Sequence, residues 1–174
     1  MAVKSIDSLQ NLIDAVSTSA VVNIPELKAG DFVRVANTQR AEYFMGKSAV
    51  TFPFRINKEL KAIKIWPGSG SEELRQRYSM TEKYPDKKGF DFFVKSSLIQ
   101  DVINLKGANY DALVMEWAGH QTLKEYIYAN IDKEEVINEL AEKILLVHKY
   151  LNKEFIAHGR FHAGSFHIDS ANRL

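Results

Sequence analysis

Residues 50–66 read VTFPFRINKELKAIKIW, and this stretch decides the fold class. Between residues 50 and 56, large apolar side chains alternate with smaller or polar ones. Because successive side chains of a strand point to opposite faces, this period of two predicts a strand over 50–56. A turn at 57–59 and a returning strand over 60–66 complete a hairpin. Pro53 cannot donate a backbone hydrogen bond, so we expect its strand to be an edge or to carry a bulge.

The segments around the hairpin predict further strands and helices. Helical spacing predicts a helix over 6–16 with Ser5 as its cap, and another over 69–84 that Pro85 ends. Short apolar runs predict strands over 32–36, 90–94, 102–105 and 112–117, with a turn at 106–109.

The second half of the chain is predicted to be more regularly helical. Thr122 followed by Glu125 is a capping-box pattern that opens a helix over 123–130. Asp132 followed by Glu135 resembles the same device and opens a longer helix, over 132–152. Strands therefore come first and helices later, which indicates an α+β fold rather than a βαβ array. The apolar stripe of the long helix consists of Val136, Leu140, Ile144, Val147 and Leu151.

Composition and charge exclude several classes of protein. The 174 residues, 19.8 kDa, suffice for one compact domain or two small lobes. A net charge of +1 provides no broad basic face for nucleic acid or an anionic membrane. The absence of cysteine rules out disulfides, zinc ribbons and thiol nucleophiles. No apolar run approaches the roughly 18 residues of a membrane span, and the N-terminus does not resemble an export signal, so we expect a cytoplasmic protein.

Two motifs resemble ligand sites without meeting their requirements. Residues 41–48 read AEYFMGKS and end like a phosphate-binding loop, but that loop needs glycines and a following helix. Bulky residues and a following strand favour a hairpin tip here. His158, His162 and His167, with Asp169, offer ligands for zinc or nickel. Their spacing matches no standard metal site, so we interpret them as incidental loop residues.

A third set of motifs is more specific because its members follow a fixed order. In chain order they are AIK at 62–64 on a strand, Glu72, Glu73 and Glu82 on the next helix, VMEW at 114–117 ending a strand, GHQTLKEYI at 119–127 opening a helix, and HGRFHAGS at 158–165 followed by FHID. This order resembles the protein-kinase fold. More narrowly, it is similar to bacterial kinase-like proteins with an HGDLxxGN catalytic loop and an MEW-type hinge. The resemblance covers about residues 30–174.

The resemblance implies how the chain is divided. Residues 1–30 would form an N-terminal helix and connector. Residues 31–118 would form the small lobe of a kinase, an antiparallel sheet with one helix. Residues 119–174 would form the first helices of a truncated large lobe, ending just after the catalytic loop.

The resemblance also implies a nucleotide site. Lys64 matches the lysine that neutralises the α and β phosphates of ATP, with Glu82 as its partner on the next helix and Glu73 as the fallback. Gly46 is what remains of the glycine-rich loop. The adenine-facing positions are the gatekeeper Met115 and the backbones of Glu116 and Ala118.

The catalytic loop departs from the family pattern. After His158 and Gly159, the family has an aspartate that accepts the proton of the substrate hydroxyl, whereas this chain has Arg160. Arginine cannot act as a base, because its pKa exceeds about 12. Ser165 replaces the asparagine that helps to hold magnesium, and the sequence ends at Leu174, before the main magnesium aspartate is expected. We therefore expect impaired phosphoryl transfer and no magnesium site, in a degenerate relative or a fragment.

Three functions follow from these observations. The first is a catalytically impaired pseudokinase that binds ATP weakly and acts through a protein partner. The second is an ATP-dependent phosphotransferase with residual activity, using Lys64 and Glu82. The third is a structural or assembly module whose cleft is filled by aromatic side chains such as Phe44, Trp66 and Trp117.

The long helix raises a question of packing. In a whole kinase later helices would wrap it, so its apolar side chains around residues 144–151 would lack partners here. We expect either self-association through this helix or its covering by the helix over 6–16.

Overall fold

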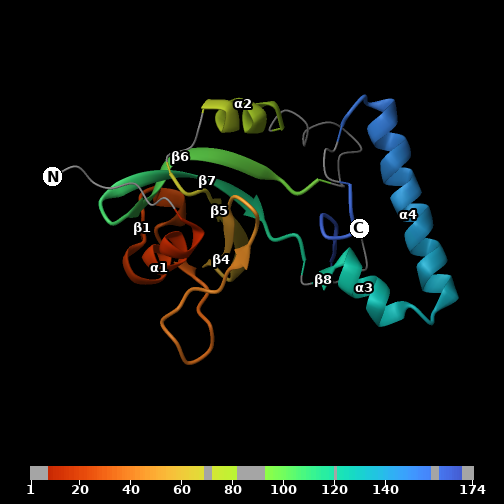
Figure 1. Ribbon diagram of the computed structural model, residues 1–174, viewed down its shortest axis with the longest axis horizontal. Coiled ribbons are helices and arrows are strands. Elements are labelled where there is room, and N and C mark those ends of the chain that lie inside the picture. Colours follow the sequence, from red (N-terminus) through yellow and green to blue (C-terminus); the bar gives the residue numbers. More distant parts are fainter. Residues whose placement is uncertain (1–7, 69–71, 82–92, 120, 158–160, 170–174) are drawn as a thin grey trace. The chain divides into compact units, whose positions relative to one another are not determined.

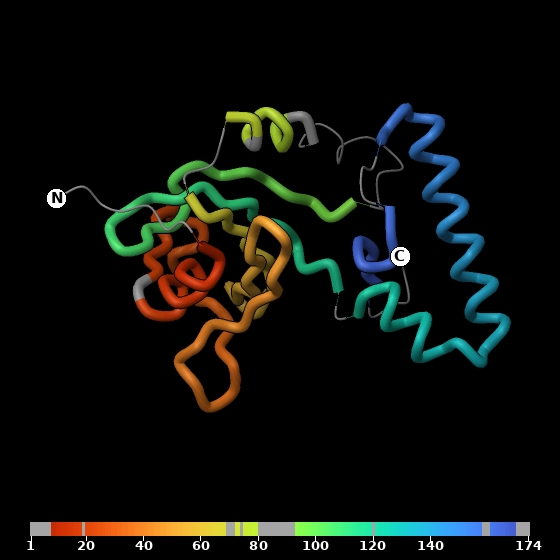
Figure 2. Tube along the Cα trace, viewed as in Figure 1, coloured from red at the N-terminus to blue at the C-terminus, as the bar shows by residue number. Residues whose placement is uncertain are grey.

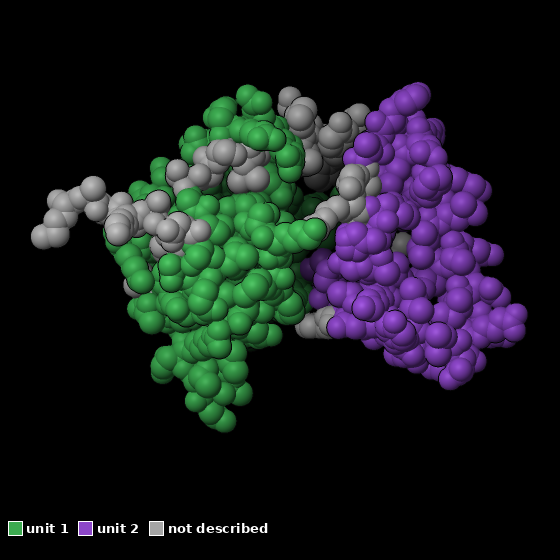
Figure 3. All heavy atoms as spheres, viewed as in Figure 1, with its two compact units in different colours: residues 1–117 green, residues 118–174 purple. Residues whose placement is uncertain are grey.

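The computed structural model describes residues 8–68, 72–81, 93–119, 121–157 and 161–169 (Figures 1 and 2). The chain divides into two compact units, Met1–Trp117 and Ala118–Leu174 (Figure 3). The first unit is built on an antiparallel sheet, and two α-helices dominate the second. The α+β class predicted from the order of elements is therefore confirmed.

The sheet of the first unit has the strand order β1-β6-β7-β5-β4-β2, with β3 also paired to β4. Its helices are α1 (Leu9–Ser19), the short 3₁₀ helix η1 (Pro25–Leu27) and α2 (Glu72–Thr81). The strands are β1 (Val21–Val22), β2 (Asp31–Phe32), β3 (Phe44–Met45), β4 (Val50–Ile56), β5 (Glu59–Ile65), β6 (Ser96–Leu105) and β7 (Ala108–Glu116).

The predicted hairpin forms the centre of this sheet. Ile56 of β4 pairs with Glu59 of β5, so only Asn57 and Lys58 make the turn. Both have positive φ, 47° and 73°, as a tight turn between right-twisted strands requires. The turn between β6 and β7 repeats this design at residues 106 and 107.

Pro53 does not lie in an edge strand, contrary to the prediction. Its carbonyl accepts the N–H of Val33, so its nitrogen faces the same side of β4. On that side β3 pairs with residues 50 and 51 and β2 with residues 54 and 55. The missing donor therefore falls in the gap between two short strands, where no ladder hydrogen bond is lost.

Two other strand predictions need correction. β2 ends at Phe32, and Arg34 forms only an isolated bridge with Ala41, so no strand spans 32–36. Phe93 and Val94 are not in a strand, and the rest of the segment 90–94 lies outside the described residues. β6 instead begins at Ser96, because its polar first half still pairs with β7. The pairing register shifts between Ile99 and Ile103, where β6 bulges.

Helix α1 belongs to the core of the sheet. Ser8 caps it, accepting the N–H of Asn11 at 3.2 Å, so the cap is not Ser5. The helix packs against β4 and β6. Its apolar face is therefore buried within the first unit. The shared core includes Leu12, Ile13, Val16, Phe52, Phe54, Ile63, Ile65 and Ile103.

The second unit contains β8 (Gln121–Thr122), α3 (Leu123–Asn130), α4 (Glu134–Lys153) and β9 (His167–Ile168). The predicted bounds of α3 and its capping box are confirmed. The predicted cap at Asp132 is wrong, because the N–H of Lys133 closes a turn onto the carbonyl of Asn130 and Lys133 itself precedes α4. The small core of this unit is formed by Leu123, Leu140 and Ile168.

The two sides of α4 differ from the predicted packing. Val147 and Leu151, which were expected to lack packing partners, are buried. Leu145, of which the same was expected, is 50% exposed, and its neighbour Leu146 is 58% exposed. Within the described residues, no helix combines the length and the apolar character needed to cross a lipid bilayer.

Candidate functional site

Lys64 lies on the face of the sheet opposite to α1. Residues directly opposite each other on antiparallel strands share a face, and the register aligns Thr51, Lys64 and Leu113 in one row. The neighbouring row on the same face holds Ala62 and Met115. We call the surface formed by these five residues the Lys64 face.

The side chain of Lys64 is half-buried and held by an aromatic ring. Its Nζ lies 5.5 Å from the centre of the Trp66 ring, a cation–π contact. Trp66 in turn packs on Tyr78 of α2, with ring centres 5.6 Å apart. Burial raises the pKa of the Tyr78 hydroxyl, which Arg77 partly offsets. A fixed cation beside a helix and two aromatic rings is suited to binding an anion with a planar group.

A second aromatic pair reaches across this face. Phe44 of β3 contacts Trp117, which follows β7, with ring centres 5.8 Å apart. Because β4 and β5 lie between β3 and β7, the two rings must meet above the sheet. The Nε1 atom of Trp117 is buried and has no hydrogen-bond partner among the described residues. A buried donor without an acceptor is costly, so an acceptor atom placed here would be favoured.

Two glutamates were predicted as the partner of Lys64: Glu82 and, as the fallback, Glu73. Glu82 lies outside the described residues. Glu73, the fallback, is 82% exposed on α2 and pairs with Arg77 at 3.4 Å. Glu73 therefore points to solvent and neutralises a different cation.

Helix α2 is fixed by an ion pair that the sequence analysis missed. Asp111 of β7 is buried, and one of its oxygens accepts from Nε and Nη2 of Arg75, both at 2.9 Å. Its other oxygen accepts the N–H of Asp101, at 3.1 Å, in the bulge of β6. One carboxylate thus ties a helix to two strands. The sequence feature that pointed to this ion pair is the charged Asp111 within the apolar run YDALVM, because a buried charge requires a partner.

Two other predicted positions of the nucleotide site, Glu116 and Gly46, use their backbone N–H groups in hydrogen bonds to neighbouring carbonyls. The N–H of Glu116 is donated to the carbonyl of Lys95, at 3.0 Å. The N–H of Gly46 is donated to the carbonyl of Ala49, and strand β4 follows at once. The segment 41–48 is therefore a hairpin tip, as predicted, because a phosphate loop requires free N–H groups and a helix. Ala118 is half-buried and belongs to the second unit.

The histidine-rich segment of the second unit contains a closed turn. The N–H of Gly164 is donated to Nδ1 of His162, at 3.1 Å, so the ring proton of neutral His162 is on Nε2. Nε2 then donates to the hydroxyl of Ser165, at 3.1 Å. His162 therefore does not act as a base towards Ser165 in this arrangement. His158 and Arg160 lie outside the described residues, and no group of three metal-ligating side chains occurs among the described ones.

His167 of the second unit lies in an unusual environment for a titratable group. It is half-buried in β9, and its Nδ1 has no hydrogen-bond partner within the described ranges. Burial lowers its pKa, and the nearby carboxylate of Glu125 partly offsets this. Hydrogen bonds from the backbone and hydroxyl of Thr122 lower the pKa of Glu125 itself.

These shifts predict that acid destabilises the second unit. A lowered pKa means that the unfolded chain binds the His167 proton more readily, so stability is full above the ordinary value of 6.5 and falls as the pH drops below it. Glu125 acts in the same direction at lower pH, below its ordinary value of 4.5. The free energy of unfolding, measured with urea, should therefore fall as the pH is lowered from 7.5 to 5. His167→Asn should make this fall smaller. The exposed His148 provides the control, and an equal reduction in His148→Asn would contradict the assignment.

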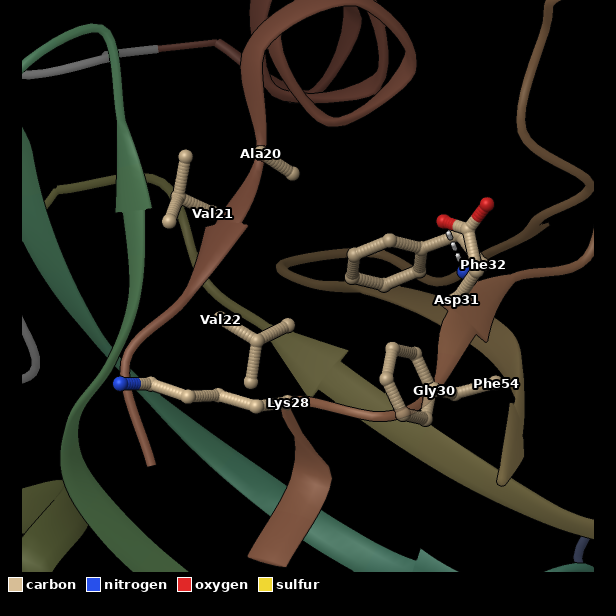
Figure 4. A pocket seen from close by; sticks show the side chains of 8 residues that line it. All are labelled: Ala20, Val21, Val22, Lys28, Gly30, Asp31, Phe32 and Phe54. Carbon is tan, nitrogen blue, oxygen red and sulfur yellow. Dashed lines mark hydrogen bonds between the residues drawn. The ribbon is translucent and has the colours of Figure 1, made fainter. Parts of the chain in front are cut away.

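A cavity of about 380 Å³ lies elsewhere in the first unit (Figure 4). Figure 4 shows the charged ends of Lys28 and Asp31 pointing to opposite sides. Asp31 already accepts the N–H of Phe32 and pairs with Arg34. The charges do not converge, so the cavity does not form a charged binding site. Its lining residues are Ala20, Val21, Val22, Lys28, Gly30, Asp31, Phe32 and Phe54.

No protein-family model matches the chain, and no curated protein matches it.

Proposed function

We propose that the chain is a catalytically impaired, kinase-like module that binds a nucleotide weakly on the Lys64 face and acts through a protein partner. The observation that carries the proposal is the position of Lys64. It is a half-buried cation on the inner strand β5, where it pairs with Leu113 of β7. Ala62 and Met115 form the neighbouring pair on the same face. This agrees with the position that the kinase resemblance implies for a phosphate-neutralising lysine.

The groups on this face fit a nucleotide. Lys64 provides a positive charge for phosphate oxygens. The unpartnered Nε1 of Trp117 would gain an acceptor from the base. Trp66, Phe44 and Trp117 supply aromatic surface for stacking.

The same chain lacks the groups that phosphoryl transfer requires. Arg160 stands where an aspartate would accept the proton, and Ser165 stands where an asparagine would bind magnesium. The Ser165 hydroxyl is also engaged by His162. Binding without efficient transfer is therefore the expected behaviour. The competing enzyme hypothesis, residual transfer through Lys64 and Glu82, requires a base from another residue.

Calorimetric titration with ATP and ADP, with and without magnesium, tests the proposal. We expect saturable binding that magnesium changes little, weakened about tenfold or more in Lys64→Ala because a charge-assisted contact is lost. Lys61→Ala is the matched control, since Lys61 lies on the same strand but the opposite face and pairs with Glu59. A parallel radiolabelled phosphotransfer assay should give no signal. Turnover that depends on Lys64 would favour the enzyme hypothesis instead.

One observation favours the structural module as a second candidate. The contact between Phe44 and Trp117 covers the Lys64 face, and a permanently closed face would exclude nucleotide. Phe44→Ala removes this cover and separates the two candidates. If the face is closed, the wild-type chain does not bind and Phe44→Ala does. If the face is open to nucleotide, both bind, and Phe44→Ala binds more weakly through lost stacking.

A further inference from the structure

The outward side of α4 carries an ordered row of exposed side chains. Helical geometry places residues 135, 142, 145, 146, 149 and 153 on one side, opposite the buried Leu140, Val147 and Leu151. We call this row the α4 outer stripe. At its middle are the exposed Leu145 and Leu146. All six of its residues are exposed: Glu135, Glu142, Leu145, Leu146, Lys149 and Lys153.

The charges along the α4 outer stripe are segregated by sign. The glutamates precede the two leucines, and the lysines follow them. None of these four charged residues takes part in an ion pair within the described part of the chain. Glu142 and Lys149 lie seven residues apart, about two helical turns, so they do not reach each other along the helix.

We propose that α4 pairs with α4 of a second copy of this chain, in antiparallel orientation, about a twofold axis between Leu145 and Leu146. In this arrangement Glu142 of each copy lies opposite Lys149 of the other. Glu135 and Lys153 come within about one turn of each other at the ends. The four leucines meet at the centre, between two symmetric ion pairs.

Self-complementarity is what identifies the occupant as a second copy. A twofold interface uses the same patch on both partners, so its charge pattern must match its own reverse. The order acidic, apolar, basic meets this condition only in the antiparallel orientation. A parallel pair would place Glu142 against Glu142 and Lys149 against Lys149, which is unfavourable.

The size of the helix sets the expected strength. Twenty residues span about 30 Å, and two helices alone bury less than the roughly 800 Å² per partner of a standard interface. We therefore expect a weak dimer that forms at high micromolar concentration. The pairing does not depend on nucleotide binding, so its failure would leave the function proposed above untouched.

Sedimentation velocity of the full chain over a concentration series tests the proposal. Glu142→Lys and Lys149→Glu should each weaken dimerisation about tenfold or more, since each change replaces both symmetric attractions by repulsions. The double variant should recover wild-type affinity. An equimolar mixture of the two single variants should form the heterodimer, because each then meets opposite charges. Glu26→Lys and Lys47→Glu, exposed positions of the first unit, control for net charge.

Substitution of the leucines separates association from folding. Leu145→Ser and Leu146→Ser should abolish the dimer and leave the thermal midpoint of the monomer nearly unchanged, because both side chains are already exposed. A wild-type chain that stays monomeric at millimolar concentration overturns the proposal. A dimer whose affinity is unchanged in both Glu142→Lys and Lys149→Glu also overturns it. So does a double variant that does not recover the wild-type affinity.

Discussion

Asp111→Ala is expected to lower the free energy of unfolding by about 3 kcal/mol, since breaking a buried ion pair leaves a charge without its partner. The Asp111 side chain is 5% exposed and binds both Arg75 and the N–H of Asp101. The substitution therefore leaves the N–H of Asp101 without its acceptor and leaves the Arg75 guanidinium with only its longer pairing to Glu72, at 3.9 Å. Arg75 is partly exposed, which keeps the loss near the lower end of the range for buried pairs.

Urea unfolding measures this effect against a matched control on the same helix. Glu73→Ala removes the ion pair with Arg77, in which both side chains are exposed, and should cost about 0.5 kcal/mol or less. Arg75→Met should cost at least as much as Asp111→Ala, because it leaves the buried carboxylate of Asp111 without its cation. Equal losses for Asp111→Ala and Glu73→Ala would show that the buried pair does not fix α2.

Gly119→Ala is expected to cost a similar amount, about 3 kcal/mol, in the second unit. Gly119 has a φ of 108°, which L side chains rarely adopt. A Cβ atom built there would lie 2.6 Å from the carbonyl oxygen of Ile168, which is backbone and cannot rotate away. The added methyl group would push β9 away from the segment that precedes β8.

Gly68→Ala separates the two causes. Gly68 also has a positive φ, 78°, but a Cβ atom there meets nothing within 4 Å. It should cost only about 1 kcal/mol, the backbone penalty alone. Thermal unfolding of both variants gives the comparison. If Gly119→Ala is no worse than Gly68→Ala, the close approach of β9 to Gly119 does not constrain the second unit.

Local rules predicted those elements in which one signal dominates. The hairpin of β4 and β5 follows from period-two alternation, and α3 follows from the capping box of Thr122 and Glu125. The pattern failed where a tertiary partner overrides it. Asp132 suits a cap by type, but the turn after Asn130 carries the chain one residue further before α4 begins.

Long-range contacts explain what the sequence did not reveal about the site. The polar start of β6 did not suggest a strand, yet pairing with β7 makes it one. The partner of Asp111 is 36 residues away, so the charge was visible in the sequence and its role was not. Likewise, helical periodicity identified the apolar stripe of α4, but only packing shows that its Val147 and Leu151 are buried.

The most direct test of the central claim is a titration of tryptophan fluorescence with ATP. The chain has two tryptophans, and both report on this site: Trp66 lies beside Lys64, and Trp117 contacts Phe44. Nucleotide binding on the Lys64 face predicts a saturable change in emission that Lys64→Ala weakens about tenfold or more and Lys61→Ala leaves intact. A change that Lys61→Ala weakens equally, or no change at millimolar ATP in the wild-type chain, would contradict it.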